Sequence, residues 1–155
     1  MEIERKFLVN GDSWRQVAGS GLVCEQGYLS SSVNGATVRV RKIGAEGWLT
    51  IKGPSSGISR LEMEYQIPVA DAEVLLQTLC GDQIVSKTRY CVEFSGFVWE
   101  IDEFSGANRG LVLAEIELEK EDQRFEKPDW VGQEVSEDSC YYNAALAKKP
   151  FSSWK

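Results

Sequence analysis

The chain has 155 residues, a formal net charge of −7 and no histidine. Its length is typical of one domain with a sizeable core, so we expect residues 1–155 to form a single domain. The acidic balance argues against a general nucleic-acid binder and against attachment to membranes through a basic patch. Without histidine, acid–base chemistry and metal binding would depend on carboxylate, lysine and tyrosine side chains.

The four cysteines lie far apart in the sequence and include no Cys-x-x-Cys pair. This spacing does not indicate a zinc site or a redox motif, so we expect reduced structural thiols. No apolar run approaches the roughly 20 residues of a membrane-spanning helix, and the first residues are charged, unlike a signal peptide. We therefore expect a cytoplasmic protein that binds neither membranes nor nucleic acid.

In the first half of the chain, stretches that alternate polar and apolar residues predict β-strands, because successive side chains of a strand point to opposite faces. A capping-box sequence at Ser13–Gln16 predicts a short helix after the first of these strands. The second strand carries Gln26 and Tyr28 on one face. In chain order the predicted strands cover residues 2–9, 22–31, 37–41 and 48–52.

The second half repeats this order of elements, which predicts two similar β-α-β-β-β halves. Its helix would be capped by Asp71 and followed by Gly81 as a C-terminal signal. A further helix is predicted around Tyr141–Lys148, with an apolar face that includes Leu146. The predicted strands of this half cover residues 60–67, 87–90, 98–102 and 113–119.

The charged faces of these strands occur in blocks of one sign, whereas a solvated sheet surface would more often mix signs within a strand. Three carboxylates on one face of residues 113–119 repel one another unless cations lie opposite. The acidic blocks are Glu2/Glu4, Glu62/Glu64, Glu100/Asp102 and Glu115/Glu117/Glu119. The basic blocks are Arg39/Arg41, Lys52 and Lys87/Arg89.

The paired faces predict an α+β fold in which about eight strands close into a β-barrel, with its helices packed outside. Charged side chains would then point into the interior and bind a highly charged ligand. Arginine and lysine rows suit a polyphosphate, and carboxylate clusters suit Mg²⁺ or Mn²⁺, which bridge to phosphate oxygens. Together they indicate phosphoryl-transfer chemistry, in which positioning and charge neutralisation provide most of the rate.

The first strand, Glu2-Ile3-Glu4-Arg5-Lys6, resembles the N-terminal ExExK signature of the CYTH superfamily, the triphosphate tunnel metalloenzymes. The signature alone is weak, but the resemblance continues along nearly the whole chain in the order typical of the family. The matching segments are Val38–Arg41, Leu49–Lys52, Arg60–Glu64, Lys87–Tyr90, Trp99–Asp102 and Ala114–Glu119.

The resemblance implies an eight-stranded antiparallel tunnel that binds a triphosphate together with Mg²⁺ or Mn²⁺. It implies that the phosphates contact Lys6, Arg39, Arg41, Lys52, Lys87 and Arg89. It assigns the first metal to Asp102, Glu115 and Glu117, and a second metal or its waters to Glu2 and Glu4. Lys6 and Tyr28 would lie side by side as catalytic candidates that activate or orient water. Supporting positions are Glu62, Glu64 and Glu100.

The compact chain resembles the short bacterial inorganic triphosphatases, which implies metal-dependent hydrolysis of tripolyphosphate to pyrophosphate and orthophosphate. Other activities of the same fold stay open: thiamine-triphosphate or nucleoside-triphosphate hydrolysis and adenylate cyclisation. A non-catalytic polyphosphate-binding module is the alternative from another class of protein. The expected binding partner is a small triphosphate. The oligomeric state stays open, and a homodimer is one of the alternatives.

Overall fold

The computed structural model describes residues 1–30 and 35–154, which fold as an antiparallel α+β protein. Residue 31, the predicted end of the second strand, lies outside the described residues. The strands are β1 (Glu2–Val9), β2 (Leu22–Ser30), β3 (Thr37–Ile43), β4 (Glu46–Lys52), β5 (Ser59–Arg60), β6 (Glu62–Ile67), β7 (Ile84–Phe94), β8 (Phe97–Phe104), β9 (Val112–Glu117) and β10 (Val131–Glu134). The helices are α1 (Val69–Thr78) and α2 (Asn143–Lys148), with 3₁₀ turns η1 (Ser13–Gln16), η2 (Gly106–Asn108), η3 (Ser139–Tyr141) and η4 (Phe151–Ser153).

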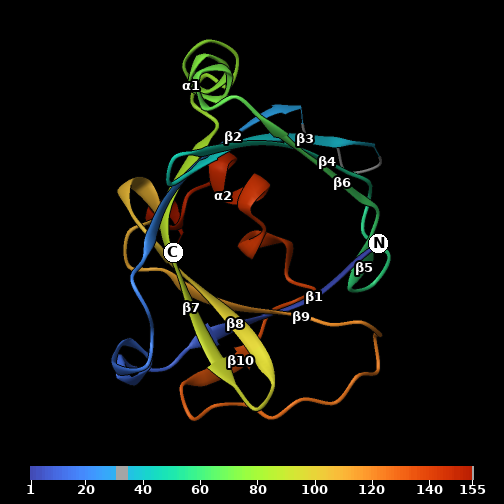
Figure 1. Ribbon diagram of the computed structural model, residues 1–155, viewed down its shortest axis with the longest axis vertical. Coiled ribbons are helices and arrows are strands. Elements are labelled where there is room, and N and C mark those ends of the chain that lie inside the picture. Colours follow the sequence, from blue (N-terminus) through green and yellow to red (C-terminus); the bar gives the residue numbers. More distant parts are fainter. Residues whose placement is uncertain (31–34, 155) are drawn as a thin grey trace.

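The strands form one strongly curved sheet in the order β10-β1-β9-β8-β7-β2-β3-β4-β6, with β5 paired to β1 (Figure 1). Each predicted strand is present, and the halves β1-η1-β2-β3-β4 and β6-α1-β7-β8-β9 share the predicted order of elements. Because neighbouring strands are antiparallel and in register, their charged faces all turn to the concave side of the sheet.

The predicted closed eight-stranded barrel is wrong in its closure and its strand count. The described residues form ten strands, and the path of the sheet ends at β10 and β6. The free edge of β1 is shared: β10 pairs with its second half at Phe7, and β5 pairs only with Glu2 and Ile3. The stretch predicted as one strand, residues 60–67, is interrupted at Leu61, so only two residues reach β1.

The convex side of the sheet carries two apolar layers. Helix α1 lies outside the curve of the sheet, over β3 (Figure 1). Its Ala72 and Leu76, with Cys80 just after the helix, pack against Val40 of β3. On the other half, an aromatic cluster covers β1, β8 and β9 and contains Phe7, Trp14, Trp99 and Trp130. All four aromatic side chains are buried and pack on one another or on Tyr90 and Phe125, so these tryptophans are packing residues.

Helix α2 lies on the concave side of the sheet, which corrects the prediction that all helices pack outside (Figure 1). Its Leu146 packs against Val85, Phe104 and Leu113, three inward-facing residues at one end of β7, β8 and β9. The inner face of these strands therefore changes from charged to apolar along its length. The C-terminal segment covers the apolar end because exposing it to water would cost free energy.

Two predicted helix starts are also corrected. Ser13–Gln16 forms a 3₁₀ turn without a side-chain cap, and Asp71 lies in the first turn of α1, two residues after its first residue, instead of capping it. Pro68 precedes α1, and its fixed backbone suits the start of a helix. The four cysteines are free thiols, as predicted. Within residues 1–30 and 35–154, no helix is long and apolar enough to span a bilayer.

Candidate functional site

The concave side of the sheet encloses a cavity of about 770 Å³. Every predicted site residue except Asp102 lines it, including both catalytic candidates and all six predicted phosphate-binding residues. Local alternation places these side chains on one face of each strand, and the antiparallel register aligns the strands: Lys6 lies opposite Glu115, and Tyr28 lies opposite Arg39. Segments of η3 and α2 complete the lining, with Tyr142, Asn143 and Lys148.

The basic wall of the cavity is formed by Arg39 and Arg41 on β3. The Arg39 guanidinium donates to Thr50 Oγ1 (3.2 Å), and both guanidinium groups lie 3.4–3.5 Å from Glu64 Oε2. The Nε atoms of both arginines are buried and have no hydrogen-bond partner among the described residues. Burial and the neighbouring Arg39 charge lower the pKa of Arg41. An anion in the cavity would offset the repulsion between the two guanidinium groups.

Lys52 extends this wall toward the end of β1. Its Nζ lies 3.1 Å from Glu2 Oε1 and 3.1 Å from Glu62 Oε2. Burial opposes the charge of Lys52, but the neighbouring carboxylates outweigh it and raise its pKa. The lysine is therefore cationic, with Glu62 as a counter-ion, just as Glu64 is a counter-ion of the two arginines.

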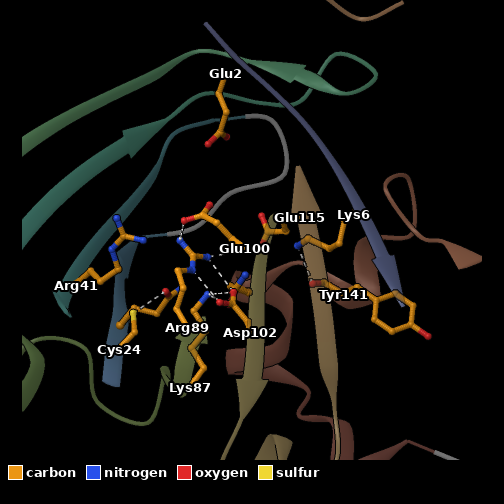
Figure 2. Close-up of polar contacts among 12 residues, drawn as sticks. Glu2, Lys6, Cys24, Arg41, Lys87, Arg89, Glu100, Asp102, Glu115 and Tyr141 are labelled. Carbon is orange, nitrogen blue, oxygen red and sulfur yellow. Dashed lines mark hydrogen bonds and ion pairs between the residues drawn. The ribbon is translucent and has the colours of Figure 1, made fainter. Parts of the chain in front are cut away.

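Arg89 and Lys87 on β7 form a second basic group that shares one buried carboxylate. Arg89 donates from Nε and NH2 to the two oxygens of Asp102 (2.8 and 2.9 Å), and Lys87 Nζ lies 2.8 Å from Oδ2. Figure 2 shows Arg89 between Asp102 and Glu100, its second partner at 3.2 Å. Burial alone would raise the pKa of Asp102, but Lys87 and Arg89 outweigh it and lower that pKa.

Asp102 is 1% exposed and does not line the cavity. With both oxygens engaged by cations, this arrangement favours an anchoring role over the metal-binding role that the family resemblance implies. Asp102 holds Lys87 and Arg89 in place, and both of these residues line the cavity. Buried charges are tolerated when they are paired in this way.

The acidic wall is centred on Glu4 of β1 and Glu115 of β9. Burial raises the pKa of Glu4 well above its usual value, and repulsion from the Glu115 carboxylate is the second cause. Burial opposes the charge of Glu115, but Lys6 and a hydrogen bond from the Glu4 carboxyl group hold its pKa well below the usual value. Two carboxyl groups that share a proton form a place where a divalent cation can replace that proton.

The carboxyl groups of the cavity suit Mg²⁺ or Mn²⁺, which can take further ligands from water and substrate. They do not suit a metal ion that needs all of its ligands from the protein. In the part of the chain that the structure describes, no three Asp, Glu, Cys or His side chains converge on one point. Mg²⁺ commonly takes one or two carboxylates and completes its shell with water and substrate phosphates. Glu4 and Glu115 supply such a pair, and Glu2 and Glu117 line the same cavity.

The catalytic candidates Lys6 and Tyr28 both line the cavity but lie on different walls. Three strands, β9, β8 and β7, separate β1 from β2 along the sheet. Lys6 Nζ donates to the backbone oxygen of Tyr141 (3.1 Å) and lies 5.6 Å from the Tyr142 ring centroid. Tyr28 has Gln26 as its hydrogen-bond partner, and the described residues include no hydrogen bond between Lys6 and Tyr28.

Sequence reasoning missed several residues that contact the predicted ones. Thr50 could have been found, because it lies two residues before Lys52 on the same face of β4. Asn143 could not: its Oδ1 accepts from Lys87 Nζ (3.1 Å) only because α2 folds back into the sheet. The backbone contact from Tyr141 to Lys6 likewise has no local sequence signal.

The geometry is that of a protein whose cavity has a basic wall and a carboxyl pair, an arrangement suited to a polyanion with a divalent cation. The CYTH domain model matches residues 1–146, and the chain belongs to the CYTH domain family. An inorganic triphosphatase of Acetivibrio thermocellus is 49% identical over 154 residues, covering 99% of this chain and 97% of that protein. An inorganic triphosphatase of Nitrosomonas europaea is 40% identical over 149 residues, covering 94% and 96%.

Solved structures show the same fold. A crystal structure of an inorganic triphosphatase superposes with a TM-score of 0.67 at 37% identity, covering 95% of this chain and 94% of that one. A Pyrococcus horikoshii structure has a TM-score of 0.60 at 22% identity, covering 77% and 79%, and this likeness concerns the fold alone. The resemblance inferred from the sequence is therefore confirmed at the level of the family.

Proposed function

We propose that the chain is a divalent-metal-dependent inorganic triphosphatase that hydrolyses tripolyphosphate to pyrophosphate and orthophosphate. The observation that carries the proposal is that Arg39 and Arg41 line the same cavity as the carboxyl pair Glu4–Glu115. Relatives named inorganic triphosphatase at 49% and 40% identity support this substrate.

In the proposed mechanism the basic groups bind the phosphate oxygens and orient the chain of phosphates. Arg39 and Arg41 act from β3, and Arg89 acts from β7, held by Asp102. Their fixed positions matter because phosphoryl transfer depends on positioning and on neutralising the charge of the phosphoryl oxygens. They are positioned before substrate arrives, so little reorganisation is needed in the transition state.

Glu4 and Glu115 would hold Mg²⁺ or Mn²⁺, with Glu2 and Glu117 bound directly or through waters. When bound, the cation would neutralise phosphate charge and lower the pKa of a coordinated water. Lys6 lies opposite Glu115 in the β1–β9 ladder, which suits it to binding a phosphate oxygen or orienting water, and Tyr28 offers a hydroxyl on the other wall. In the overall reaction the water oxygen bonds to a terminal phosphorus and one P–O–P bridge breaks. Pyrophosphate leaves with the bridging oxygen, and the two water protons pass to the orthophosphate and pyrophosphate products or to solvent.

The test is a substrate panel of tripolyphosphate, ATP and thiamine triphosphate, each with Mg²⁺ or Mn²⁺. Orthophosphate, pyrophosphate and cyclic AMP are measured together. We expect fastest turnover of tripolyphosphate, with equal amounts of orthophosphate and pyrophosphate. Preferred turnover of either organic substrate would replace the inorganic assignment, and cyclic AMP would identify a cyclase. Tight tripolyphosphate binding without product would identify a binding module.

The homodimer and the cytoplasmic location stay predictions. The near-closure of the sheet through β5 at Glu2 and Ile3 supports a tunnel-like enclosure around the substrate.

A further inference from the structure

Cys24, Gln26 and Tyr28 are successive inward-facing residues of β2 and form one hydrogen-bonded row. Cys24 Sγ lies 3.7 Å from Gln26 Oε1, and Gln26 Nε2 lies 2.8 Å from the Tyr28 hydroxyl oxygen. Cys24 and Gln26 are 0% exposed, and of these three residues only Tyr28 lines the cavity. Figure 2 shows Cys24 close to Arg41 of the basic wall.

The chemistry of the three groups gives the row a direction. A thiol donates through its S–H, the amide oxygen only accepts, and the amide nitrogen only donates. The Cys24 thiol therefore favours the orientation in which Gln26 Oε1 faces it and Nε2 faces Tyr28. In that orientation the Tyr28 oxygen is an acceptor, and its own proton is not used within the row.

The charged groups facing Tyr28 leave that proton available to a ligand. The cations whose charges act on the hydroxyl are Arg39 and Lys52, and neither side chain can accept a hydrogen bond. Tyr28 lies directly opposite Arg39 in the β2–β3 ladder. An anion drawn to Arg39 would therefore be an acceptor for the tyrosine hydroxyl.

We propose that Gln26 is a positioning residue that directs the hydroxyl proton of Tyr28 toward an oxygen atom of the substrate or of the attacking water. The inference rests on the proposed triphosphatase function and adds a residue to it. Gln26 itself touches no substrate, because it is fully buried behind the cavity lining. Cys24 contributes by orienting the Gln26 amide group.

The first test is a double-mutant cycle on tripolyphosphate turnover with Gln26→Leu and Tyr28→Phe. Leucine keeps an apolar side chain of similar reach and removes the amide, and phenylalanine removes only the hydroxyl. We expect each single variant to lower single-turnover rate about 10- to 100-fold, while tripolyphosphate affinity stays within a few-fold. The double variant should be no slower than Tyr28→Phe, because Gln26 acts through that hydroxyl.

Matched variants separate positioning from packing. Cys24→Ser retains a donor and should lose less turnover than Cys24→Ala, which removes it. Gln66→Leu removes an exposed glutamine amide that bonds Glu46 on a neighbouring strand and should leave turnover unchanged. Thermal unfolding identifies any variant that fails to fold, in which case Gln26→Met replaces Gln26→Leu. Turnover of Gln26→Leu equal to wild type, or additive loss in the double variant, would overturn the proposal.

A readout without turnover keeps the inference separate from the proposed function. With carbon-13 at Cζ of the five tyrosines, the Tyr28 resonance is the one absent from Tyr28→Phe. This resonance should shift in Gln26→Leu and stay in place in Gln66→Leu, because Gln26 donates to the phenol oxygen and Gln66 does not. If wild type hydrolyses no triphosphate, the proposed function fails, and this shift alone decides the positioning role. An unmoved Tyr28 resonance overturns it.

Discussion

Lys87 Nζ and Asp102 Oδ2 lie 2.8 Å apart, and both side chains are 1% exposed. Arg89 contacts the same carboxylate through two nitrogens, so one buried anion holds two cations of the cavity. Removing a partner from a buried ion pair costs more than the pair contributes, because the remaining charge loses both water and its counter-ion. The stability of the fold and the arrangement of the site therefore both depend on the Asp102 carboxylate.

We expect Asp102→Asn to lower the free energy of unfolding by about 3–5 kcal/mol, because Lys87 and Arg89 lose their shared counter-charge. Urea unfolding of metal-free protein measures this. Glu100→Gln is the matched control: Glu100 also contacts Arg89, but its side chain is 37% exposed, so the loss should stay below about 1 kcal/mol. Equal stability of Asp102→Asn and wild type would show that the buried pairing contributes little.

The stability difference between wild type and Asp102→Asn should depend on pH. The pKa of Asp102 is lower in the folded protein than its ordinary value of 3.8. Its stabilising contribution is therefore fully present above that ordinary value and is lost as pH falls through the lowered pKa. Unfolding curves for both proteins at several acidic pH values should converge only below about pH 4. Convergence near neutral pH would contradict the lowered pKa.

Turnover of tripolyphosphate should require added Mg²⁺ or Mn²⁺ and should cease in excess chelator, because the carboxyl pair binds hard cations. Glu115→Gln should weaken metal affinity, with turnover partly recovered at high metal concentration. We expect Ca²⁺ to bind and inhibit, since its larger and looser shell would misplace the phosphates. Full activity in chelator would rule out the metal assignment for Glu4 and Glu115.

Arg39→Ala and Arg41→Ala should each weaken tripolyphosphate binding by about 1.5–3 kcal/mol, the usual size of a hydrogen bond to a charged group. Both should fold normally, because their side chains face a wet cavity. Arg15→Ala removes an arginine whose partners are Asp12 and Glu103 outside the cavity, and it should bind as wild type does. Calorimetric titration of all three variants makes the comparison. Normal affinity in both cavity variants would mean that the anion binds elsewhere.

Gly27→Ala should destabilise the protein by about 1–3 kcal/mol through overpacking. A Cβ at Gly27 would lie 2.6 Å from Cys80 Sγ and 2.8 Å from Cys80 Cβ, where α1 packs on β2. Gly19→Ala provides the control, because its Cβ would have no atom within 4 Å. Thermal unfolding of the two variants tests the contact, and equal melting temperatures would show that α1 shifts at little cost.

The sequence by itself determined which side chains share a face of each strand. Alternation is a local property of the extended backbone, so Arg39 and Arg41, or Glu115 and Glu117, had to point to the same side. Same-sign blocks on several strands then indicated an enclosed charged face, and the ordered motifs indicated the CYTH family. Local patterning was less informative at strand ends: Glu119 lies beyond β9, which ends at Glu117.

Only the tertiary structure decided how those faces meet. Packing of Leu146 against Val85 and Leu113 draws α2 inside the sheet, which no helical periodicity can show because an apolar stripe fits any apolar partner. Strand β10 pairs with the second half of β1, and β5 pairs with its first two residues. The path of the sheet through the described residues therefore ends at β10 and β6. The same long-range contacts bury Asp102 beneath two cations and place Lys6 and Tyr28 on separate walls. These outcomes depend on which strands pair. The alternation of polar and apolar residues within one strand does not predict its neighbours in the sheet.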